Sequence, residues 1–599
     1  MTDNSVVTAP QAGFWKKTWR LVWPYMHSEQ WKSAWGLLIA VIGLALFGIY
    51  LDVQFNFWHR DFYNLLQQKD LSPAPVVFFG NELFVVNHFI YMLGKFTILA
   101  FTSIASAVYA FYLQQVLQIR WRKWITVRLT QRWLANRAYY RLQLQDYGTD
   151  NPEQRIQADI ASFTDSTLTL SIGLLSNIVN LVTFVGILWG ISGPLAFVLG
   201  GHNVVIPAYM VWAAVFYAIF GSVGTYLIGR KLVAVNFAQE RYNADFRYRM
   251  TRVRDNAESI ALYGGEAREQ AGLDLSFGNV WSNWWRFMIV SKQLNWFRLF
   301  YQQLAVIFPL LVAAPRYFSG AIDLGTLIQI SSAFGQVQSS LSWFVQAYQD
   351  LAAWKATTNR LITFVDALER VETDARHQTL VVEPQSASEV ELAASDIAVP
   401  TGRTLMQDIQ IQIPRGDKVL ISGPSGSGKT TLFRVLAGLW PFANGKLRVP
   451  KGANVLFLSQ KPYLPLGTLR EAVAFPSDPG AFVDDQIKAA LEDVRLPHLV
   501  NRLDDDDNWS MSLSVGEQQR LAIARALLNK PDWLFMDEAT SALDDENERH
   551  VYELITQRLA HSAIVSIAHR PSVAAYHNRR IAIEPELQQV QSASLAAAE

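Results

Sequence analysis

The sequence predicts an α-helical transmembrane bundle of six spans, followed by an α/β domain that carries a helical subdomain. Three observations support this fold class. Half of the 599 residues are apolar and only 17% are charged, against about a quarter in ordinary soluble domains. Long apolar stretches occur only before residue 348. After about residue 386, short strand patterns and glycine-rich turns replace them.

The N-terminal segment, residues 1–33, combines a polar tail with an aromatic and basic stretch from Phe14 to Arg20. Tryptophan beside lysine and arginine is typical of helices that lie in the membrane interface. We therefore expect a tail followed by an interfacial elbow helix that leads into the first span.

Residues 34–347 form the expected six-helix transmembrane domain, since a span needs about 20 mostly apolar residues. The candidate spans are residues 34–51, 89–113, 168–189, 204–228, 296–314 and 324–347. The fifth is short, the sixth is polar, and Lys95 lies inside the second. The connections after spans two and four have helical patterns, which indicates helices that extend well beyond the membrane.

The distribution of basic residues predicts the orientation. Lys and Arg are frequent after spans two, four and six, and scarce in the loops at 52–88, 190–203 and 315–323. By the positive-inside rule, we expect both termini in the cytoplasm. The chain then continues through a connector at 348–385, the α/β domain at 386–587 and a C-terminal tail at 588–599.

A phosphate-binding loop follows the predicted strand 418–422. It contains Gly423, Pro424, Ser425, Gly426, Ser427, Gly428, Lys429 and Thr430, with Thr431 next in a predicted helix. The glycines let backbone N–H groups point inward, and the helix N-terminus adds positive potential. Lys429 supplies a positive charge for the phosphates, and the Thr430 hydroxyl can ligate Mg²⁺. The pattern predicts that ATP binds here with Mg²⁺.

A second apolar strand, residues 533–537, ends in the carboxylates Asp537 and Glu538. Parallel pairing could bring this strand beside the phosphate loop. Asp537 would then act on Mg²⁺ through its water shell, and Glu538 would polarise the attacking water as the catalytic base. Alone, an apolar strand that ends in Asp-Glu is a weak signal.

Further motifs make the sequence resemble the ABC-type ATPases. Leu513–Arg520 resembles the family's signature sequence, about twenty residues before the Asp-Glu pair. Ser541–Asp544 resembles the D-loop, Ser566–Arg570 the switch-histidine segment, and Leu458–Tyr463 the Q-loop. The resemblance implies a type IV exporter fold for the whole chain, with ATP hydrolysis as its enzymatic activity.

The resemblance also implies roles for single residues. His569 would contact the γ-phosphate, and Gln460 would contact Mg²⁺. Asp544 would lie at a dimer interface. The residues implied to reach ATP held by a partner chain are Ser514, Val515, Gly516 and Glu517. Because the chain has one phosphate loop and one signature, and a composite site needs both from opposite chains, the expected assembly is a homodimer.

Two positions depart from the family pattern. Val515 stands where the signature usually has glycine, and a β-branched residue restricts φ, so a slight change of local geometry is expected. Val399 lies where the family usually has an aromatic residue that stacks on adenine. The sequence therefore does not predict how adenine is held.

The membrane half resembles two groups within the family. Asn151–Ile156 and Asp245–Glu269 resemble the two cytoplasmic contact segments of peroxisomal acyl-CoA-type half-transporters. Arg316–Gly320, Leu324–Gln329 and Trp354–Ala356 resemble the bacterial SbmA/BacA-like group. Both resemblances imply an ATP-driven transporter embedded in a lipid bilayer, and the second implies the bacterial inner membrane.

The two resemblances imply different cargo. The SbmA/BacA-like one implies bulky hydrophilic or amphipathic molecules, such as peptides or cobalamin-like compounds. The acyl-CoA-type one implies very-long-chain fatty acids or their CoA esters as the alternative, and neither fixes the direction of transport. A channel or mechanical device switched by nucleotide belongs to another class, and the intact Glu538 and His569 argue against it.

The sixth predicted span carries a polar stripe that includes Gln329, Ser332 and Gln336 on one helical face. Polar groups that face lipid are costly, so this stripe should face a wet cavity or another helix. We expect a cargo cavity, and helix–helix packing is the alternative.

The composition excludes some functions. The chain has no cysteine, which excludes disulfides, thiolate catalysis and Cys-ligated metals. The formal net charge is zero, and no motif indicates a nucleic-acid partner.

Overall fold

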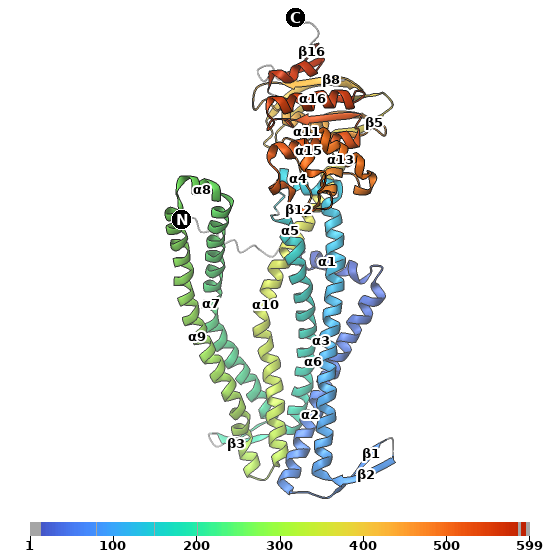
Figure 1. Cartoon of the computed structure of the whole chain (residues 1–599). Coiled ribbons are helices and arrows are strands. Elements are labelled where there is room, and N and C mark those ends of the chain that lie inside the picture. Colours follow the sequence, from blue (N-terminus) through green and yellow to red (C-terminus); the bar gives the residue numbers. More distant parts are fainter. Residues whose placement is uncertain are drawn as a thin grey trace. The chain divides into compact units, whose positions relative to one another are not determined.

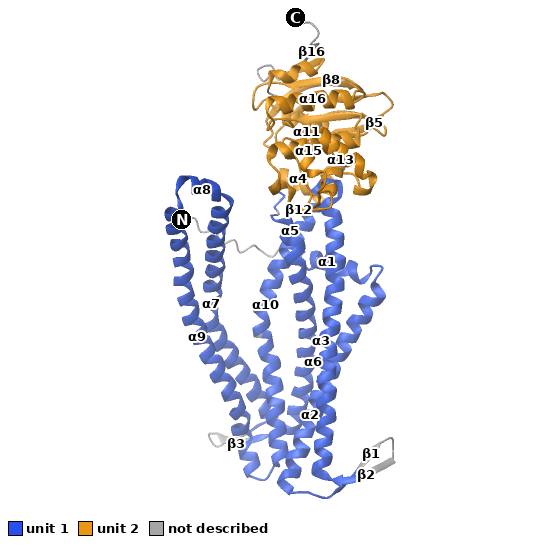
Figure 2. Ribbon diagram, in the orientation of Figure 1, with its two compact units in different colours: residues 1–138, 147–368 blue, residues 139–146, 369–599 orange. Residues whose placement is uncertain are grey.

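A computed structural model of the chain describes residues 13–78, 81–145, 147–148, 150–199, 202–568, 570–584 and 589–594. The chain divides into two compact units (Figure 2). The first contains residues 1–138 and 147–368, and the second contains residues 139–146 and 369–599.

The first unit consists of long helices joined by short connections (Figure 1). Its helices are α1 (Phe14–Met26), α2 (Trp31–Gln68), α3 (His88–Leu134), α5 (Pro152–Gln154), a π-helical turn (Arg155–Asp159), α6 (Ile160–Ser192), α7 (Tyr209–Asp255), α8 (Ala257–Tyr263), α9 (Glu266–Phe318) and α10 (Leu324–Arg376). Two antiparallel hairpins, β1 (Pro73–Phe78) with β2 (Asn81–Asn87) and β3 (Leu195–Leu199) with β4 (His202–Ile206), join helices. A 3-10 turn, Ala135–Arg137, follows α3.

Five of the described helices are long and apolar enough to cross a membrane: α2, α3 with its continuation to Leu144, α5–α6, α7 and α9. α10, which contains the sixth predicted span, does not reach the same apolarity. Its core face explains why it can still lie inside the bundle, because Ile330, Phe334 and Val337 are fully buried against other helices. An interior helix is shielded from lipid by its neighbours, so its other faces can carry amides and hydroxyls.

Close packing of α7 against α9 depends on two glycines. A Cβ atom at Gly221 would lie 2.2 Å from Cζ of Tyr301, and one at Gly224 would lie 2.1 Å from Cζ of Phe297. Only glycine leaves room for these rings. The two helices therefore run side by side and are joined by α8 (Figure 1).

The elbow helix α1 is attached to the C-terminal half of α10. Lys17 forms an ion pair with Asp366 at 2.8 Å, and the rings of Phe14 and Trp15 pack against Trp354. Further along α1, Tyr25 is fully buried and stacks on Trp121 of α3. These contacts fix α1 at both ends.

A buried ionic network fixes the segment that begins α6. Asp159 accepts hydrogen bonds from Arg155 at 3.0 Å and from both Nε and Nη2 of Arg360 on α10, at 2.9 and 2.7 Å. Arg155 also pairs with Asp150. Because Asp159 and Arg155 are nearly inaccessible to solvent, this network joins α6 to α10 more firmly than a surface pair would.

The second unit contains two larger sheets flanked by helices (Figure 1). The six-stranded sheet has the order β10 (Val455–Leu458), β13 (Trp533–Asp537), β14 (Ala563–Ile567), β8 (Lys418–Ser422), β15 (Arg579–Glu584), β16 (Gln589–Ser594). All neighbouring pairs are parallel except β15 with β16. The four-stranded sheet has the order β5 (Leu380–Gln385), β9 (Ala443–Pro450), β6 (Glu389–Ala398), β7 (Thr404–Pro414).

The remaining elements of this unit are mainly helical. They are α4 (Ala138–Leu144), α11 (Lys429–Leu436), β11 (Gly467–Thr468), α12 (Leu469–Ala474), α13 (Asp484–Asp493), β12 (Asp506–Asp507), α14 (Trp509–Ser512), α15 (Val515–Asn529) and α16 (Asp545–Arg558), with 3-10 turns at Pro479–Ala481, Pro497–Leu499 and Pro571–Tyr576. α12 to α15 share a core that includes Ile487, Leu491 and Trp509, which forms the helical subdomain.

Candidate functional site

The loop between β8 and α11 has the backbone conformation that a phosphate loop needs. Gly426 and Gly428 have φ angles of +81° and +92°, which lie in the left-handed region that L side chains rarely adopt. Gly428 is also the N-cap of α11. The loop therefore turns sharply into a helix N-terminus, where backbone N–H groups attract anions.

Two polar side chains of this loop are buried. Lys429 donates hydrogen bonds from Nζ to the carbonyl oxygens of Gly423 and Pro424, both at 2.8 Å. Burial lowers the pKa of Lys429, and the nearby carboxylates of Glu538 and Asp537 partly oppose this effect. Ser427 Oγ is buried without a described hydrogen-bond partner. Pro424, Ser425 and Thr430, by contrast, are exposed, and Thr431 is half-buried.

The predicted carboxylates lie beside this loop although their strands are not neighbours. β14 lies between β8 and β13, yet the Thr430 hydroxyl is hydrogen-bonded to Asp537. Burial raises the pKa of Asp537, and the carboxylate of Glu538 raises it further. Glu538 has a φ angle of +50°, so the chain bends sharply directly after the strand.

The predicted Q-loop residue reaches the same place. Gln460 donates a hydrogen bond from Nε2 to Glu538 Oε2 at 2.8 Å. The structure thus brings Lys429, Thr430, Asp537, Glu538 and Gln460 together at one site. His569 lies outside the described residues.

Gln519, which was predicted only as part of the signature segment, connects the surrounding loops. Its Nε2 atom donates to the carbonyl oxygen of Gln460 at 2.9 Å, and its Oε1 atom accepts from the backbone N–H of Ala542 at 2.9 Å. The side chain is almost completely buried. A buried amide that is bonded on both sides fixes α15 to the Q-loop and to the loop after β13. Its position within the signature segment at 513–520 was the sequence signal for this role.

The signature residues begin α15. Ser514 is its N-cap, and Glu517 donates its backbone N–H to Ser514 Oγ at 3.3 Å while its carboxylate accepts from the backbone N–H of Ser514 at 2.9 Å. Burial acts to raise the pKa of Glu517, but its hydrogen bonds with Ser514 lower it on balance. Ser514 and Val515 are exposed at the surface of this unit.

The backbone at Val515 does not show the slight change of local geometry that we expected from its β-branched side chain. Val515 is the first residue of an ordinary α-helix, and neither it nor Gly516 has a positive φ. A β-branched residue fits there without strain. An added Cβ at Gly516 would lie 3.2 Å from the carbonyl oxygen of Ala542, so a larger residue would be tightly packed there.

Asp544 is the N-cap of α16 and accepts from the backbone N–H of Asn547 at 2.7 Å. That hydrogen bond lowers the pKa of its exposed carboxyl group. Val399, at the expected adenine position, lies in the turn between β6 and β7, where its N–H donates to the carbonyl oxygen of Arg403 at 2.9 Å.

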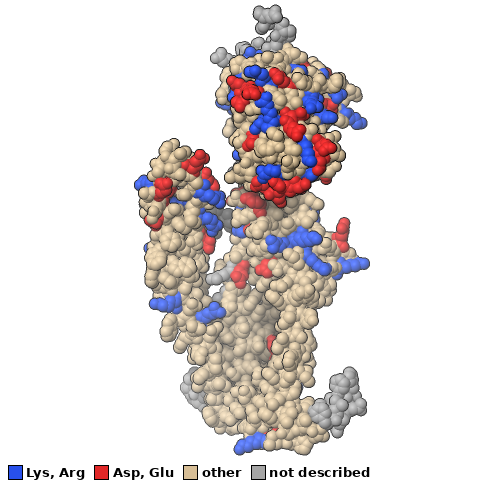
Figure 3. Space-filling model, viewed as in Figure 1, with Lys and Arg blue, Asp and Glu red and all other residues tan. Residues whose placement is uncertain are grey.

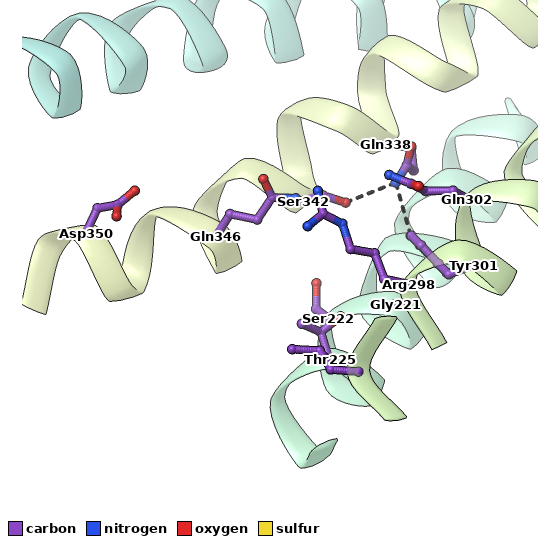
Figure 4. A pocket seen from close by; sticks show the side chains of 11 residues that line it. Gly221, Ser222, Thr225, Arg298, Tyr301, Gln302, Gln338, Ser342, Gln346 and Asp350 are labelled. Carbon is purple, nitrogen blue, oxygen red and sulfur yellow. Dashed lines mark hydrogen bonds between the residues drawn. The ribbon is translucent and has the colours of Figure 1, made fainter. Parts of the chain in front are cut away.

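The first unit contains a polar cavity between α7, α9 and α10, with a volume of about 360 Å³. Figure 4 shows its lining side chains. They are Gly221, Ser222, Thr225, Leu294, Arg298, Tyr301, Gln302, Gln338, Ser342, Gln346 and Asp350. Gln338 donates from Nε2 to Tyr301 Oη at 3.3 Å and to Ser342 Oγ at 3.1 Å. The cavity therefore offers amides and hydroxyls, together with one guanidinium group and one carboxylate.

The predicted cavity residues lie elsewhere on α10. Gln329 is fully buried, donates to Asn56 Oδ1 at 3.0 Å, and accepts from Asn56 at its backbone oxygen at 3.1 Å. Gln329 therefore packs against α2 and is not among the residues that line the cavity between α7, α9 and α10, although its Oε1 atom is buried without a described partner. Gln336 accepts from Asn180 at 3.1 Å, and Ser332 is half-buried. The spacing of Gln338, Ser342 and Gln346 was the sequence signal for the face that does line the cavity.

Comparisons with known proteins agree with the two-part organisation. The family model described as "ABC transporter transmembrane region 2" matches residues 21–318, and the model described as "ABC transporter" matches residues 406–541. An uncharacterised ABC transporter ATP-binding protein of Haemophilus influenzae is 35% identical over 95% of this chain and 92% of its own length.

Two further relatives have more specific names. ABC transporter D family member 2, chloroplastic, of Arabidopsis thaliana is 34% identical, over 95% of this chain and 86% of its own length. The inner membrane ABC transporter ATP-binding protein YddA of Escherichia coli is 31% identical, over 92% and 94%.

A solved structure of a bacterial Atm1-family ABC exporter with ATP bound has a similar fold. Its TM-score is 0.68 at 17% identity, over 93% of this chain and 95% of that chain. The predicted fold class, a helical transmembrane domain with an α/β ATPase domain, is thereby confirmed.

Proposed function

The chain belongs to the ABC transporters, is a half-transporter related to their D family and hydrolyses ATP to drive transport across a membrane, and on that premise we propose that it works as a homodimer that carries polar, peptide-like cargo. The observation that supports this cargo is the polar cavity between α7, α9 and α10.

The residues around the phosphate loop fit ATP and Mg²⁺. Ser427 Oγ is buried without a described partner, and the glycine backbone leaves space around it, as a bound phosphate requires. The Thr430 hydroxyl, the Gln460 amide oxygen and the Asp537 carboxylate are oxygen ligands, which Mg²⁺ prefers, and Asp537 would act through water. When bound, Mg²⁺ neutralises charge on the phosphates. Lys429 would turn from its own loop carbonyls to the phosphates.

We assign the catalytic base to Glu538 and the γ-phosphate contact to His569. Glu538 lies at the end of β13 beside Gln460, so a hydrogen bond already orients its carboxylate. A carboxylate held next to the γ-phosphate can orient the attacking water and accept its proton. Gln460 would then link the state of this site to the loop that Gln519 holds.

The signature residues Ser514, Val515, Gly516 and Glu517 are proposed to contact ATP held by the other protomer, with Asp544 at the interface. Three features support this role: Ser514 is exposed, it begins a 15-residue helix, and its own N-cap hydrogen bonds fix its position. The exposed helix N-terminus can accept an anion from a second molecule. Each chain has one phosphate loop and one signature, so two chains would form two composite sites.

The cavity supports peptide-like cargo for a chemical reason. Glutamine side chains both donate and accept hydrogen bonds, so Gln302, Gln338 and Gln346 suit amide groups in varied geometry. The SbmA/BacA-like resemblance supports the same cargo, including cobalamin-like compounds. Very-long-chain fatty acids or their CoA esters are the alternative, for which Arg298 would meet the acidic head group.

We place the protein in the bacterial inner membrane with both termini in the cytoplasm. The distribution of Lys and Arg supports this orientation, and the name of the YddA relative supports the membrane. The proposed division is an elbow at 1–33, a transmembrane domain at 34–347, a connector at 348–385, an ATPase domain at 386–587 and a tail at 588–599. The segments at 148–156 and 257–266 would couple ATP-driven closure to the cavity.

The test is the ATPase activity of the purified full-length protein in liposomes, measured with a panel of hydrophilic peptides, cobalamin and acyl-CoA. We expect peptides to stimulate the activity in a saturable manner and acyl-CoA to have no effect. Stimulation by acyl-CoA alone would replace the peptide proposal by the fatty acyl one. Activity that no compound in the panel changes would leave neither cargo class supported.

A further inference from the structure

A second cavity lies at the start of the first membrane span, where no cargo or nucleotide role has been assigned. It has a volume of about 400 Å³ and is lined by Glu29, Gln30, Lys32, Ser33, Arg120 and Lys123. The first four belong to the turn between α1 and α2 and to the first turn of α2, and the last two belong to α3. Three elements of the first unit thus meet around it.

The lining is strongly basic. Lys32, Arg120 and Lys123 contribute three positive charges and Glu29 one negative charge, which leaves two net positive charges in one small hollow. Within the described part of the chain, none of these three cations forms an ion pair. On the face of this unit drawn in Figure 3, Lys and Arg gather at the same level, near the elbow of α1, while the bundle beyond it carries few charges.

The surrounding contacts hold the cavity in a fixed shape. Arg120 donates a hydrogen bond to Ser33 Oγ, so α3 is tied to the first turn of α2. Tyr25, just before the turn, is fully buried and stacks on Trp121, the neighbour of Arg120. The Lys17–Asp366 ion pair holds the other end of α1. These contacts fix the backbone around the cavity and the Arg120 side chain, which favours binding of a ligand, while Lys32 and Lys123 are exposed and can reach it.

Aromatic residues place the cavity at the membrane interface. Trp31 and Trp35, in the first two turns of α2, are 51% and 38% exposed, and Lys32 Nζ lies 5.8 Å from the Trp31 ring. Exposed tryptophans at the end of an apolar span are typical of the level of lipid head groups. An acyl chain attached to a ligand in this cavity could run along these rings into the bilayer.

We infer that this cavity is a binding site for the phosphate of an anionic phospholipid of the leaflet beside α1, of the phosphatidylglycerol type. The three cations face the phosphate, while Glu29 and Gln30 accept hydrogen bonds from the hydroxyls of the glycerol head group. Trp31 and Trp35 contact the acyl chains. This site shares no lining residue with the cargo cavity, and lipid binding here does not depend on which cargo is carried.

The test counts phosphatidylglycerol bound to the delipidated full-length protein in detergent by native mass spectrometry, against phosphatidylcholine. We expect a preference for phosphatidylglycerol, and K32Q and K123Q should each weaken it by about fivefold, since one basic residue near an anionic lipid contributes about that factor. K123R should restore binding. R128Q is the matched control, because Arg128 is an exposed cation of the same helix that stacks on Trp124 and does not line the cavity.

Several results would overturn the inference. They are equal binding of the two lipids, loss of binding in R128Q as large as in K123Q, or unchanged binding in both cavity variants. Inorganic phosphate is added as a competitor at millimolar concentration. If it displaces phosphatidylglycerol completely, the site recognises free phosphate and the lipid proposal fails. Basal ATPase activity, expected to be unchanged in all variants, verifies that they are folded.

Discussion

The two compact units use polar side chains in different ways. In the second unit, Lys429 at the start of α11 and Asp537 and Glu538 at the end of β13 interact at one site. In the first unit, the glutamines of α10 are spread along one helix: Gln329 is paired with Asn56 inside the bundle, whereas Gln338 lines a cavity. Within a helical bundle, the role of an amide therefore depends on its neighbours, and residue type alone does not reveal it.

The difference has a physical cause. A loop that follows a strand can present backbone and side-chain groups to a ligand, because the sheet fixes its ends. A transmembrane helix satisfies its own backbone, so its polar side chains must find another helix or a wet space. The same glutamine can thus stabilise the bundle or contact cargo. The following substitutions separate these roles.

The largest effect is expected for Glu538→Gln. It keeps the shape of the side chain but removes the group that accepts a proton from water, so ATP turnover should fall by roughly a hundredfold or more while ATP binding remains. Glu553→Gln, at an exposed position of α16, is the control and should retain wild-type turnover. Near-normal turnover of E538Q would remove Glu538 from the catalytic role.

The next effect concerns stability. Gln329→Leu leaves Asn56 buried without its amide partner, which should cost about 1–3 kcal/mol, whereas the double variant N56L/Q329L should recover most of this loss. The measurement is the midpoint temperature of unfolding of the full-length protein in detergent. Gel filtration after heating reports the fraction that is still folded. If Q329L is as stable as the wild type but loses peptide stimulation, Gln329 contacts cargo and the contrast with Gln338 fails.

A smaller effect is expected at the cavity itself. Replacing Gln302 and Gln338 together with Leu removes about two hydrogen bonds to cargo, so the peptide concentration for half-maximal ATPase stimulation should rise about tenfold. Basal ATPase activity should stay unchanged. Q346L alone should raise the peptide concentration for half-maximal stimulation by less than the double variant does. An unchanged concentration in the double variant would exclude this cavity as the peptide site.

The smallest effect is the pH dependence of the stability of the second unit. His577 is buried and its ring nitrogens contact the Val573 carbonyl oxygen and Ser566 Oγ, and burial lowers its pKa. Because the unfolded chain binds the proton more readily, the stabilisation by neutral His577 is present above about pH 6.5 and is lost as the pH falls below it.

Through this one group, the free energy of unfolding should change by no more than about 1.4 kcal/mol per pH unit. Thermal midpoints of the wild type and of H577Q, compared between pH 7.5 and 5.5, measure it. The difference in thermal midpoint between the wild type and H577Q should be smaller at the lower pH than at the higher one. A difference that stays constant with pH would show that His577 does not titrate on unfolding.

The sequence predicted the second unit more completely than the first. Phosphate binding demands particular residue types at fixed spacing, so Gly428, Lys429 and Asp537 could be placed before the fold was known. Gln519 was not singled out, because its role depends on tertiary hydrogen bonds to the backbone around Gln460 and Ala542. The intervening strand β14 was also not predicted, since strand order is a property of the assembled sheet.

In the first unit, the sequence predicted helices but not their polar contacts. Helical spacing placed Gln329 on a polar face, but only the position of Asn56, 273 residues earlier, shows that this face is covered. In the network of Arg155, Asp159 and Arg360, the hydrogen bond from Arg360 to Asp159 likewise joins distant segments, whereas Arg155 and Asp159 lie one helical turn apart. Such pairings are not encoded in the local pattern of either segment.

The most direct test of the central claim is the movement of a fluorescent hydrophilic peptide across proteoliposomes that contain the full-length protein. We expect ATP-dependent movement in one direction by the wild type, none by E538Q, and an apparent peptide affinity about tenfold weaker in Q302L/Q338L. N56L/Q329L, the control at a glutamine of α10 that is not among the residues lining the cavity, should transport normally. Movement that does not require ATP, or a double cavity variant that transports like the wild type, would contradict the account.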